Sequence, residues 1–336
     1  MKRTLLLAAL FALLGAGAFY AVYYKKNNNA SRVSWDMDFS VAGTEKIFKI
    51  FLADRLGKSI TLERQADGRW LCNGKYPARP SAVNTLLETM RKQVVSYIPP
   101  DAAVKGMVKS LASEGIKVEL YGKDGDKIKV FYVGGVTNDE RGTFMIMEGA
   151  EQPYVVHVPS FVGQLRLHYM MNEIDWRDRT IFSEKPESIQ AISVEYPQQR
   201  SESFKLEKTG EANYAVSPFY STTPVSQNPQ RKGAAEAYLL QFESLGVEAF
   251  ENENTLRDSV QALIPFAIVT VKRENGSEKQ MRFWPLSFES RMDDGRQAVN
   301  RYFAATDSDF LLVQERVFGP VFRGYRYFFE SGRLKN

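Results

Sequence analysis

Short runs of apolar residues, separated by turn-forming residues, recur along most of the chain and predict many β-strands and few helices. Glu45–Ala53 has few polar positions and predicts a largely buried strand. Ser59–Asn73, SITLERQADGRWLCN, predicts two strands joined by a tight Asp67-Gly68 turn. From Pro80 the apolar period becomes helical, and Pro99-Pro100 is expected to end that helix. Its apolar face consists of Val83, Leu86, Leu87, Met90 and Val94.

The following residues predict a short helix, four strands and a closing amphipathic stretch. A turn at residues 122–125 joins the first two of these strands into a hairpin. The expected elements are the helix Ala102–Ser113, the strands Ile116–Tyr121, Lys127–Val133, Gly142–Met147 and Tyr154–Val158, and the amphipathic stretch Phe161–Met171.

The second half of the chain repeats this order of elements. Ser203–Val216, SFKLEKTGEANYAV, has the same pattern as Ser59–Asn73. Seven correspondences occur in the same order: Ile47–Asp54 with Ile189–Tyr196, Leu62 with Leu206, Trp70 with Tyr214, Leu86-Leu87 with Leu239-Leu240, Val118 with Val269, Phe131 with Phe283, and Phe161 with Phe318. Because the spacing changes only in loops, we predict a tandem duplication whose period is too long for a solenoid repeat.

These patterns predict an α+β fold of two tandem similar units, each an antiparallel sheet packed with one or two helices. Residues 45–182 are expected to form the first unit and residues 183–336 the second. Residues 27–44 are predicted to be a polar linker, and residues 1–26 are predicted to hold an N-terminal transmembrane helix or a signal peptide.

Leu5–Tyr24 is an uninterrupted run without charged side chains, long enough as a helix to cross the ~30 Å hydrocarbon core of a bilayer. Aromatic residues gather at its end, and Lys25-Lys26 follows, as at a membrane–water interface. The competing interpretation is a signal peptide cleaved after Ala18, which would make the body a secreted protein. Because apolar residues continue past that position, we prefer an uncleaved anchor. The expected topology is a single pass through the inner (cytoplasmic) membrane with the C-terminal body in the periplasm.

Charge and cysteine content exclude several classes of function. Four of the 44 basic residues flank the apolar run, at positions 2, 3, 25 and 26, so 40 basic side chains balance the 40 acidic ones elsewhere. A neutral body lacks the basic surface that nucleic-acid binding requires. Cys72 is the only cysteine, and His157 and His168 are the only histidines, so neither a disulfide nor a Cys/His metal cluster is expected. We interpret Cys72 as a small buried hydrophobe and both histidines as structural.

No catalytic, cofactor-binding or metal-binding residue is assigned. The G-x-S-x-G hydrolase motif does not occur, and the folded part has neither a phosphate-binding loop nor a dinucleotide-binding motif. The acidic segments 138–140 and 293–295 are interpreted as turns rather than Ca²⁺ sites. Trp176–Arg179 is interpreted as an inter-domain clamp with Arg–Asp pairing and tryptophan packing, and the aromatic run 324–329 as a core-closing segment.

With these features together, the chain resembles the domain of unknown function 4340 family over most of residues 45–330. The resemblance rests on ITLERQADGRWLCNG, the helix pattern Val83-x-x-Leu86-Leu87, the junction WRDRTIF at 176–182 with the strand Ile189–Val194, and FKLEKTGEANYAV. Tyr214 stands where the family pattern leads us to expect tryptophan. The resemblance implies membrane-anchored bacterial envelope proteins, some of them similar to accessory subunits of gliding-motility ABC transporters. It brings no catalytic residues.

The expected function is therefore a non-enzymatic binding or scaffold module of the cell envelope, attached to the lipid bilayer through Leu5–Tyr24 and acting on a protein partner. An accessory role in a transporter complex follows from the resemblance alone. The alternative is an envelope hydrolase or glycan-acting enzyme that uses a carboxylate pair, which would require one buried carboxylate with a raised pKa.

Overall fold

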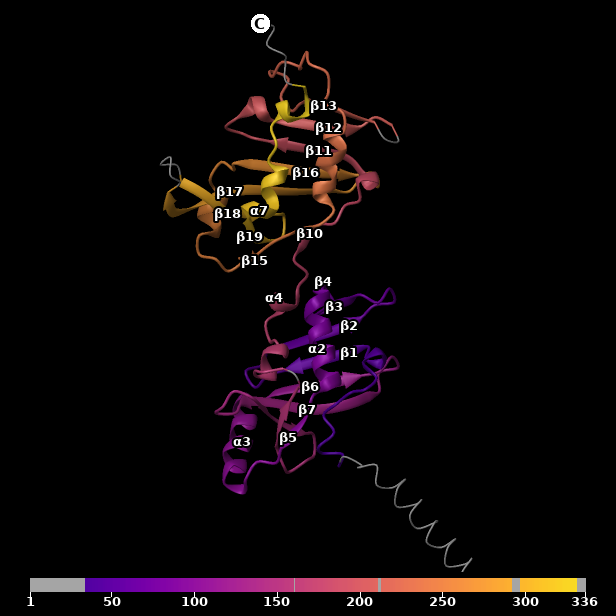
Figure 1. Cartoon of the computed structure of the whole chain (residues 1–336), viewed down its shortest axis with the longest axis vertical. Helices are drawn as coiled ribbons and strands as arrows, with labels where there is room; N and C mark the ends of the chain where they lie inside the picture. The colour runs from indigo at the N-terminus through magenta and orange to yellow at the C-terminus, as the bar shows by residue number, and fades with distance from the viewer. Residues whose placement is uncertain (1–33, 160, 211–212, 292–296, 331–336) are drawn as a thin grey trace, which may run out of the picture. The chain divides into compact units, whose positions relative to one another are not determined.

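The computed structural model describes residues 34–159, 161–210, 213–291 and 297–330. They form two compact units divided between Asp178 and Arg179, which we call the first and second units (Figure 1). Each is an α+β unit built on one large antiparallel sheet. The division falls slightly before residue 182, because β10 (Thr180–Phe182) pairs with β14 (Leu245–Gly246) of the second unit.

The first unit contains a nine-stranded sheet in the order β4-β3-β2-β1-β6-β7-β8-β9-β5. Its strands are β1 (Lys49–Ala53), β2 (Ser59–Arg64), β3 (Trp70–Cys72), β4 (Tyr76–Pro77), β5 (Val94–Tyr97), β6 (Ile116–Tyr121), β7 (Lys127–Val136), β8 (Thr143–Met147) and β9 (Tyr154–His157). Its helices are α2 (Pro80–Lys92), α3 (Asp101–Glu114) and α4 (Glu173–Trp176), with 3-10 turns η1 (Thr44–Lys46) and η2 (Leu165–His168). The predicted hairpin, the two longer helices and the four strands after them are confirmed.

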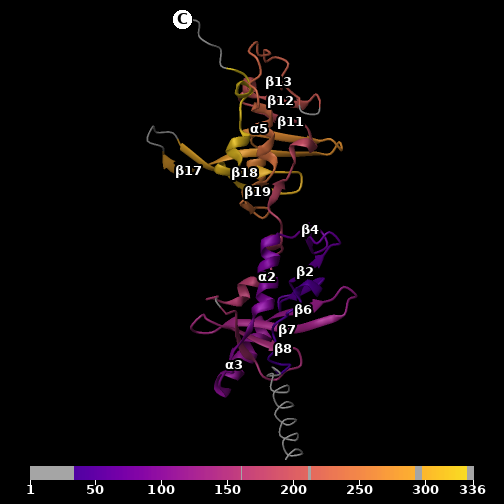
Figure 2. The ribbon, with the colours of Figure 1, turned by 45° about the vertical axis from the view of Figure 1, so that its right-hand side comes forward.

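Helix α2 runs across the strands and closes the main core of the first unit (Figure 2). It begins at Pro80, whose missing N–H costs nothing in the first turn. Strand alternation directs every second side chain to this core, including Ile50, Leu52, Val118, Leu120, Phe131 and Val133. The side chains between them face the opposite side of the sheet, where α3 packs. We call that side the α3 face.

The second unit contains an eight-stranded sheet in the order β13-β12-β11-β16-β17-β18-β19-β15. Its strands are β11 (Ile189–Glu195), β12 (Phe204–Lys208), β13 (Tyr214–Pro218), β15 (Ala249–Phe250), β16 (Ala267–Arg273), β17 (Glu278–Arg291), β18 (Gln297–Ala305) and β19 (Phe310–Gln314). Its helices are α5 (Ala234–Leu239), α6 (Arg257–Gln261) and α7 (Glu315–Phe318). Its 3-10 turns are η3 (Pro186–Ser188), η4 (Arg200–Glu202), η5 (Leu240–Phe242), η6 (Gly319–Val321) and η7 (Tyr325–Phe328).

Eight strands of the first sheet have counterparts in the same order in the second, and the register agrees for the pairs β2–β3, β1–β2 and β1–β6 with β12–β13, β11–β12 and β11–β16. In both sheets the residues that sequence comparison aligned lie at matching positions: Ile50 faces Leu62 as Ile192 faces Leu206, Leu62 faces Cys72 as Leu206 faces Val216, and Leu52 faces Val118 as Val194 faces Val269.

One predicted correspondence is wrong by two residues. Val118 faces Phe131, whereas Val269 faces Met281, so the counterpart of Phe131 is Met281 rather than Phe283. The two hairpins close with turns of the same length, but the β6–β7 pair carries a register shift between Leu120 and Tyr121 that the β16–β17 pair lacks. Because strand side chains alternate with a period of two, Phe283 still lies on the core face and the hydrophobic pattern did not reveal the shift.

The closing segments of the two units also match. In the first unit Ala78 forms an isolated bridge with Arg177, and the next N–H, that of Arg79, donates to the carbonyl of Trp176. In the second unit Gln230 bridges Phe329, and the N–H of Arg231 donates to the carbonyl of Phe328. Trp176 and Phe328 are both fully buried, so each unit closes its core with an aromatic residue near its C-terminal end.

Two other expectations need correction. The helix that starts at Pro80 ends at Lys92, and Val94 belongs to the edge strand β5 because its segment pairs with β9. The predicted linker 27–44 includes Phe39 and Val41, which are buried in the core of the first unit. None of the helices in the described ranges is long and apolar enough to cross a membrane, and Leu5–Tyr24 lies outside those ranges.

Candidate functional site

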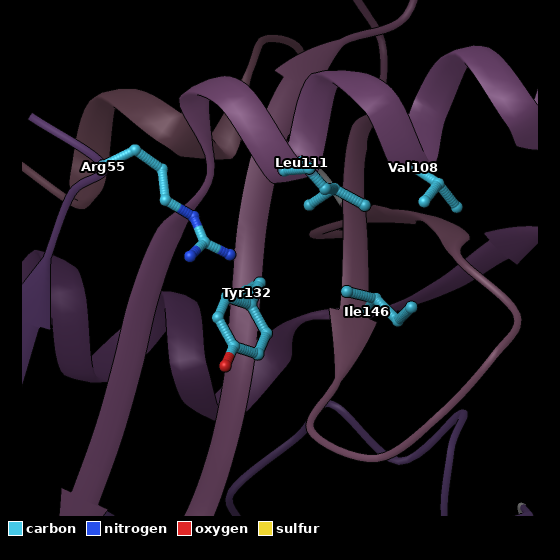
Figure 3. Close-up of a pocket in the computed structure, with 6 residues that line it drawn as sticks. Arg55, Val108, Leu111, Tyr132 and Ile146 are labelled. Atoms are coloured by element: carbon cyan, nitrogen blue, oxygen red, sulfur yellow. The ribbon is translucent and has the colours of Figure 1, made fainter.

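A cavity of about 180 Å³ opens between helix α3 and the α3 face of the first sheet. Figure 3 shows Val108 and Leu111 on the helix side and Tyr132 and Ile146 on the strand side, with Arg55 at one end. Tyr132 and Ile146 are register partners on β7 and β8, so they lie side by side as the floor. Ala112 completes the lining. We call this cavity the α3 pocket.

Gly134 is what allows α3 to approach the sheet beside the pocket. A Cβ atom at Gly134 would lie 2.8 Å from Leu111 Cδ2 and 3.1 Å from the carbonyl oxygen of Phe144. Leu111 is buried against this glycine, while Val108, one turn earlier on the helix, remains 42% exposed at the pocket. The helix side of the pocket is therefore held against the sheet at Leu111 and open to solvent at Val108.

In the second unit a tryptophan occupies the corresponding place. Following the sheet register from Phe131 and Met281, Gly134 corresponds to Trp284. The Trp284 indole packs with Phe303 and Phe310, and its N–H donates to the carbonyl of Leu263 at 3.0 Å. The open pocket is thus a property of the first unit rather than of the repeated fold.

Arg55 gives the α3 pocket its charge. It lies in the turn after β1, which the Asp54 carboxylate holds by accepting hydrogen bonds from the N–H groups of Leu56 and Lys58. Its guanidinium carbon lies 5.7 Å from the centre of the Tyr132 ring, within cation–π range. Among the residues that the structure describes, no carboxylate forms an ion pair with Arg55. The pocket therefore joins an apolar interior to an uncompensated positive charge.

A charged network lies beside the pocket on the same face. Glu119, which is only 8% exposed, accepts hydrogen bonds from Tyr121 at 2.5 Å, Lys117 at 2.9 Å and Lys127 at 3.1 Å. Lys117 also contacts Glu148 at 3.2 Å. Burial acts to raise the pKa of Glu119, but these hydrogen bonds outweigh it and lower the pKa to about 2. A general acid needs a raised pKa, so Glu119 does not match the acid that the hydrolase alternative requires.

The Glu119 network predicts a loss of stability in acid. The pKa of Glu119 falls from 4.5 to about 2 on folding, so its contribution is fully present above pH 4.5 and disappears as the pH falls towards 2. In urea denaturation across that range, Glu119→Gln is expected to be less stable than the unsubstituted chain at pH 6 and to lose less of its stability on acidification. The exposed Glu278→Gln is the control and should keep the parent pH profile. Parallel profiles for Glu119→Gln and the parent would contradict this assignment.

The cysteine and the histidines lie apart from the α3 pocket. Cys72 is fully buried in the core, and burial raises the pKa of its thiol to about 12, so it remains a thiol at neutral pH. His157 is half-buried at the end of β9 and faces Val94 on β5. His168 lies against α2, with Nδ1 2.6 Å from the hydroxyl of Thr89.

Only the first of the two acidic turns lies within the described residues. In the first, the Asp139 carboxylate accepts hydrogen bonds from the hydroxyl of Thr137 and the N–H of Arg141, so it stabilises its own turn. The second, residues 293–295, lies outside the described residues. Within the described ranges, no group of three His, Cys, Asp or Glu side chains is placed to hold a metal ion.

Three residues of the junction cluster, Trp176 to Asp178, belong to the first unit, and Arg179 begins the second. Trp176 is fully buried in the core of that unit, and its indole N–H donates to the carbonyl of Met170 at 2.9 Å. The guanidinium of Arg177 lies 3.9 Å from the centre of the Tyr76 ring. The expected role in packing is correct for Trp176, but the packing is inside one unit. At the C-terminal end, Tyr325 and Phe328 are buried, as a core-closing segment requires.

Sequence reasoning did not find the α3 pocket. The signals available were Val108 and Ala112, two apolar positions on the solvent flank of an amphipathic helix, and the Gly134-Gly135 pair within a strand. A glycine inside a strand indicates a bulge or a close approach of another segment, and here α3 makes that approach.

Comparisons with known proteins place the chain in a family. No curated protein matches it, and no solved structure does. The family described as Domain of unknown function (DUF4340) matches residues 70–261, more than half of the chain. This range includes α2, the α3 pocket residues from Val108 onwards and the first strands of the second unit. The chain therefore belongs to the DUF4340 family.

Proposed function

We propose that this chain is a non-enzymatic envelope protein, anchored in the inner membrane by Leu5–Tyr24, whose periplasmic two-unit body binds a protein partner. The anchor and the location rest on the apolar run and its aromatic and basic flanks. An accessory role beside a membrane transporter rests on the family resemblance. The observation that carries the binding function is the α3 pocket, which joins an apolar cavity to an unpaired arginine.

The occupant that fits this pocket is an apolar side chain of a partner protein with a carboxylate nearby. A cavity of about 150 Å³ holds a benzene-sized group, so the observed volume of about 180 Å³ suits one aromatic or branched aliphatic side chain. Arg55, at the end of the pocket, would pair with an Asp or Glu a few residues away in the partner. A buried apolar anchor beside a charged contact is a common form of interface hot spot.

We further propose that the two units arose by duplication and that only the first retains an open pocket. The shared strand order, the matching registers and the matching closing segments support a common origin. Trp284 fills the corresponding position of the second unit. The difference between the open α3 pocket and the packed Trp284 supports a scaffold in which the first unit binds the partner and the second unit has a structural role.

The binding function predicts a cross-link that depends on the pocket. A photoreactive residue at Val108, in the full-length protein in its own membranes, is expected to capture one envelope protein. The captured peptide should carry an apolar side chain within a few residues of Asp or Glu. Ala112→Phe, which fills the pocket from an exposed helical position, is expected to weaken capture about tenfold or more, as loss of one hot spot of about 2 kcal/mol does.

Ala103→Phe is the matched control, because Ala103 is exposed on the same helix and does not line the pocket. Arg55→Glu should also reduce capture, and replacing the nearby partner carboxylate with arginine should restore it. Equal capture by Ala112→Phe and Ala103→Phe would refute the pocket as the binding site. Recovery of the chain from the soluble periplasmic fraction would contradict the anchor.

A further inference from the structure

A second cavity, of about 250 Å³, lies in the first unit between the start of helix α2 and the segment that contains η2. We call it the α2 cavity. Arg79, Ser81 and Thr85 line it from α2 and the residue before it, and His168 faces it from η2. Ala82, Leu167 and Met170 complete the wall. The lining therefore combines one permanent cation and several hydrogen-bonding groups with an apolar portion.

Arg79 is held at this cavity by its backbone. Its N–H donates to the carbonyl of Trp176 at 2.6 Å, and its carbonyl accepts from the N–H groups of Ala82 and Val83 in the first turn of α2. Its Nη2 donates to the carbonyl of Asp175 at 3.0 Å. The position of Arg79 is thus set by the closing segment of the unit and by the start of the helix together.

The charge of Arg79 is not compensated by the protein. The residue is half-buried, its Nε is buried without a hydrogen-bond partner, and no described carboxylate pairs with it. The carbonyl of Asp175 satisfies one of five donor hydrogens. A partly desolvated guanidinium with unused donors is unfavourable, and it becomes favourable when an anion is supplied.

The second unit places its corresponding arginine in different surroundings. Arg231 makes the same backbone hydrogen bond as Arg79, to the carbonyl of Phe328. Arg231 is exposed, and its guanidinium lies 4.3 Å from the centre of the Tyr327 ring, within cation–π range. The residue that precedes Trp176, in the place of Tyr327, is Asp175, and its carbonyl rather than a ring meets Arg79. The arginine of the first unit therefore lines a cavity, whereas that of the second unit lies over a tyrosine ring.

His168 offers a second fixed polar group. Thr89 donates its hydroxyl proton to the carbonyl of Thr85 at 2.8 Å, so it accepts the hydrogen bond from Nδ1–H of His168. This bond fixes the orientation of the imidazole ring. The other nitrogen, Nε2, can accept a hydrogen bond from a ligand or, once protonated beside an anion, donate one.

We propose that the α2 cavity binds an organic carboxylate with a small apolar body, such as the end of a short-chain or aromatic acid. The carboxylate would pair with the guanidinium of Arg79, whose planar donors suit it. Ala82, Leu167 and Met170 would contact the apolar body. A volume of about 250 Å³ accommodates a group the size of benzoate. The inference is independent of the α3 pocket, which lies on the opposite face of the sheet.

Benzoate is the probe for this site. Saturation-transfer difference NMR on the purified full-length chain in detergent micelles should detect benzoate but not its neutral analogue benzyl alcohol, once signals from empty micelles are subtracted. Arg79→Met is expected to weaken benzoate binding about tenfold or more, as loss of a charged hydrogen-bonded contact does. Arg231→Met, the same change at the corresponding position of the second unit, should leave binding unchanged.

Thr85→Phe provides a second test that keeps Arg79 intact. Thr85 is an exposed residue of α2 that lines the cavity, so the larger ring fills the cavity on an otherwise unchanged helix, even if Arg79→Met fails to fold. Binding should be lost in Thr85→Phe and retained in Ala112→Phe of the α3 pocket. Equal binding of benzyl alcohol, or equal effects of Arg79→Met and Arg231→Met, would overturn the site. Displacement of benzoate by inorganic phosphate at lower concentration than by acetate would overturn the carboxylate assignment.

Discussion

Trp176→Ala is expected to lower the free energy of unfolding of the first unit by about 3–5 kcal/mol, the cost typical of removing a buried large aromatic side chain. Trp176 is fully buried, and it packs with the residues of the main core beside α2. Its truncation leaves a cavity in that core and leaves the carbonyl of Met170 without the indole N–H. The backbone carbonyl of Trp176 also accepts the N–H of Arg79. Loss of the buried side chain is therefore expected to loosen the segment that closes the unit.

Urea denaturation combined with hydrogen exchange by mass spectrometry measures this effect and locates it. In Trp176→Ala, protection should fall in β1, β6 and β7 and remain in the strands of the second unit. Phe328→Ala, the corresponding change in the second unit, should show the reverse pattern, because Phe328 is also fully buried. Trp35→Ala is the control, since Trp35 is 61% exposed. An effect of Trp176→Ala no larger than that of Trp35→Ala would contradict the closing role.

Glu184→Ala is expected to destabilise the second unit by about 3 kcal/mol, within the range for breaking a buried ion pair from one side. Glu184 is only 5% exposed and receives a two-pronged contact from Arg273, with Nε 2.7 Å from Oε2. Its backbone N–H donates to the carbonyl of Phe242, so the carboxylate is fixed above the end of β16. Removing it leaves a partly buried guanidinium without its counter-charge.

Equilibrium denaturation of three variants separates this loss from a surface effect. Glu274→Ala is the matched control, because Glu274 is next to Arg273 in sequence and its exposed carboxylate pairs with Lys208. It should change stability by no more than the error of the measurement. The double replacement Glu184→Leu with Arg273→Met should cost less than Glu184→Ala, because it leaves no unpaired charge. A double variant less stable than Glu184→Ala would contradict this expectation. It would show that the loss of stability does not come from an unpaired charge.

The repeated architecture was readable from sequence because it depends on local periods. The hairpin from Ser59, the helix from Pro80 and the strand Ile116–Tyr121 each carry a pattern that spans a few residues. The edge strand β5 was missed because Val94 and Tyr97 are exposed and give no alternation that distinguishes them from the end of the helix. Strand β5 exists because β9, which is far away in sequence, pairs with it.

The two cavities depend on contacts that no local pattern contains. Arg55, Val108 and Tyr132 come from a turn, a helix and a strand, and they meet only because α3 rests on Gly134. Arg79 faces a cavity because Trp176 and Asp175 return to the start of α2. In the second unit, residues at corresponding positions, Trp284 and Tyr327, produce packed contacts instead.

By itself, the sequence determined the α+β class, the repeated order of strands and helices and the family, because hydrophobic periodicity and turn chemistry are encoded between near neighbours. The hairpin at Ser59–Asn73 is a core element of the first unit, and its counterpart in the second unit, at Ser203–Val216, follows the same register. Only the tertiary structure decided that Trp176 packs inside the first unit, that Glu184 pairs with Arg273 and that two cavities open beside α2 and α3. Those features arise from close packing between segments far apart in the chain, and their geometry is set by the whole core rather than by any stretch of it.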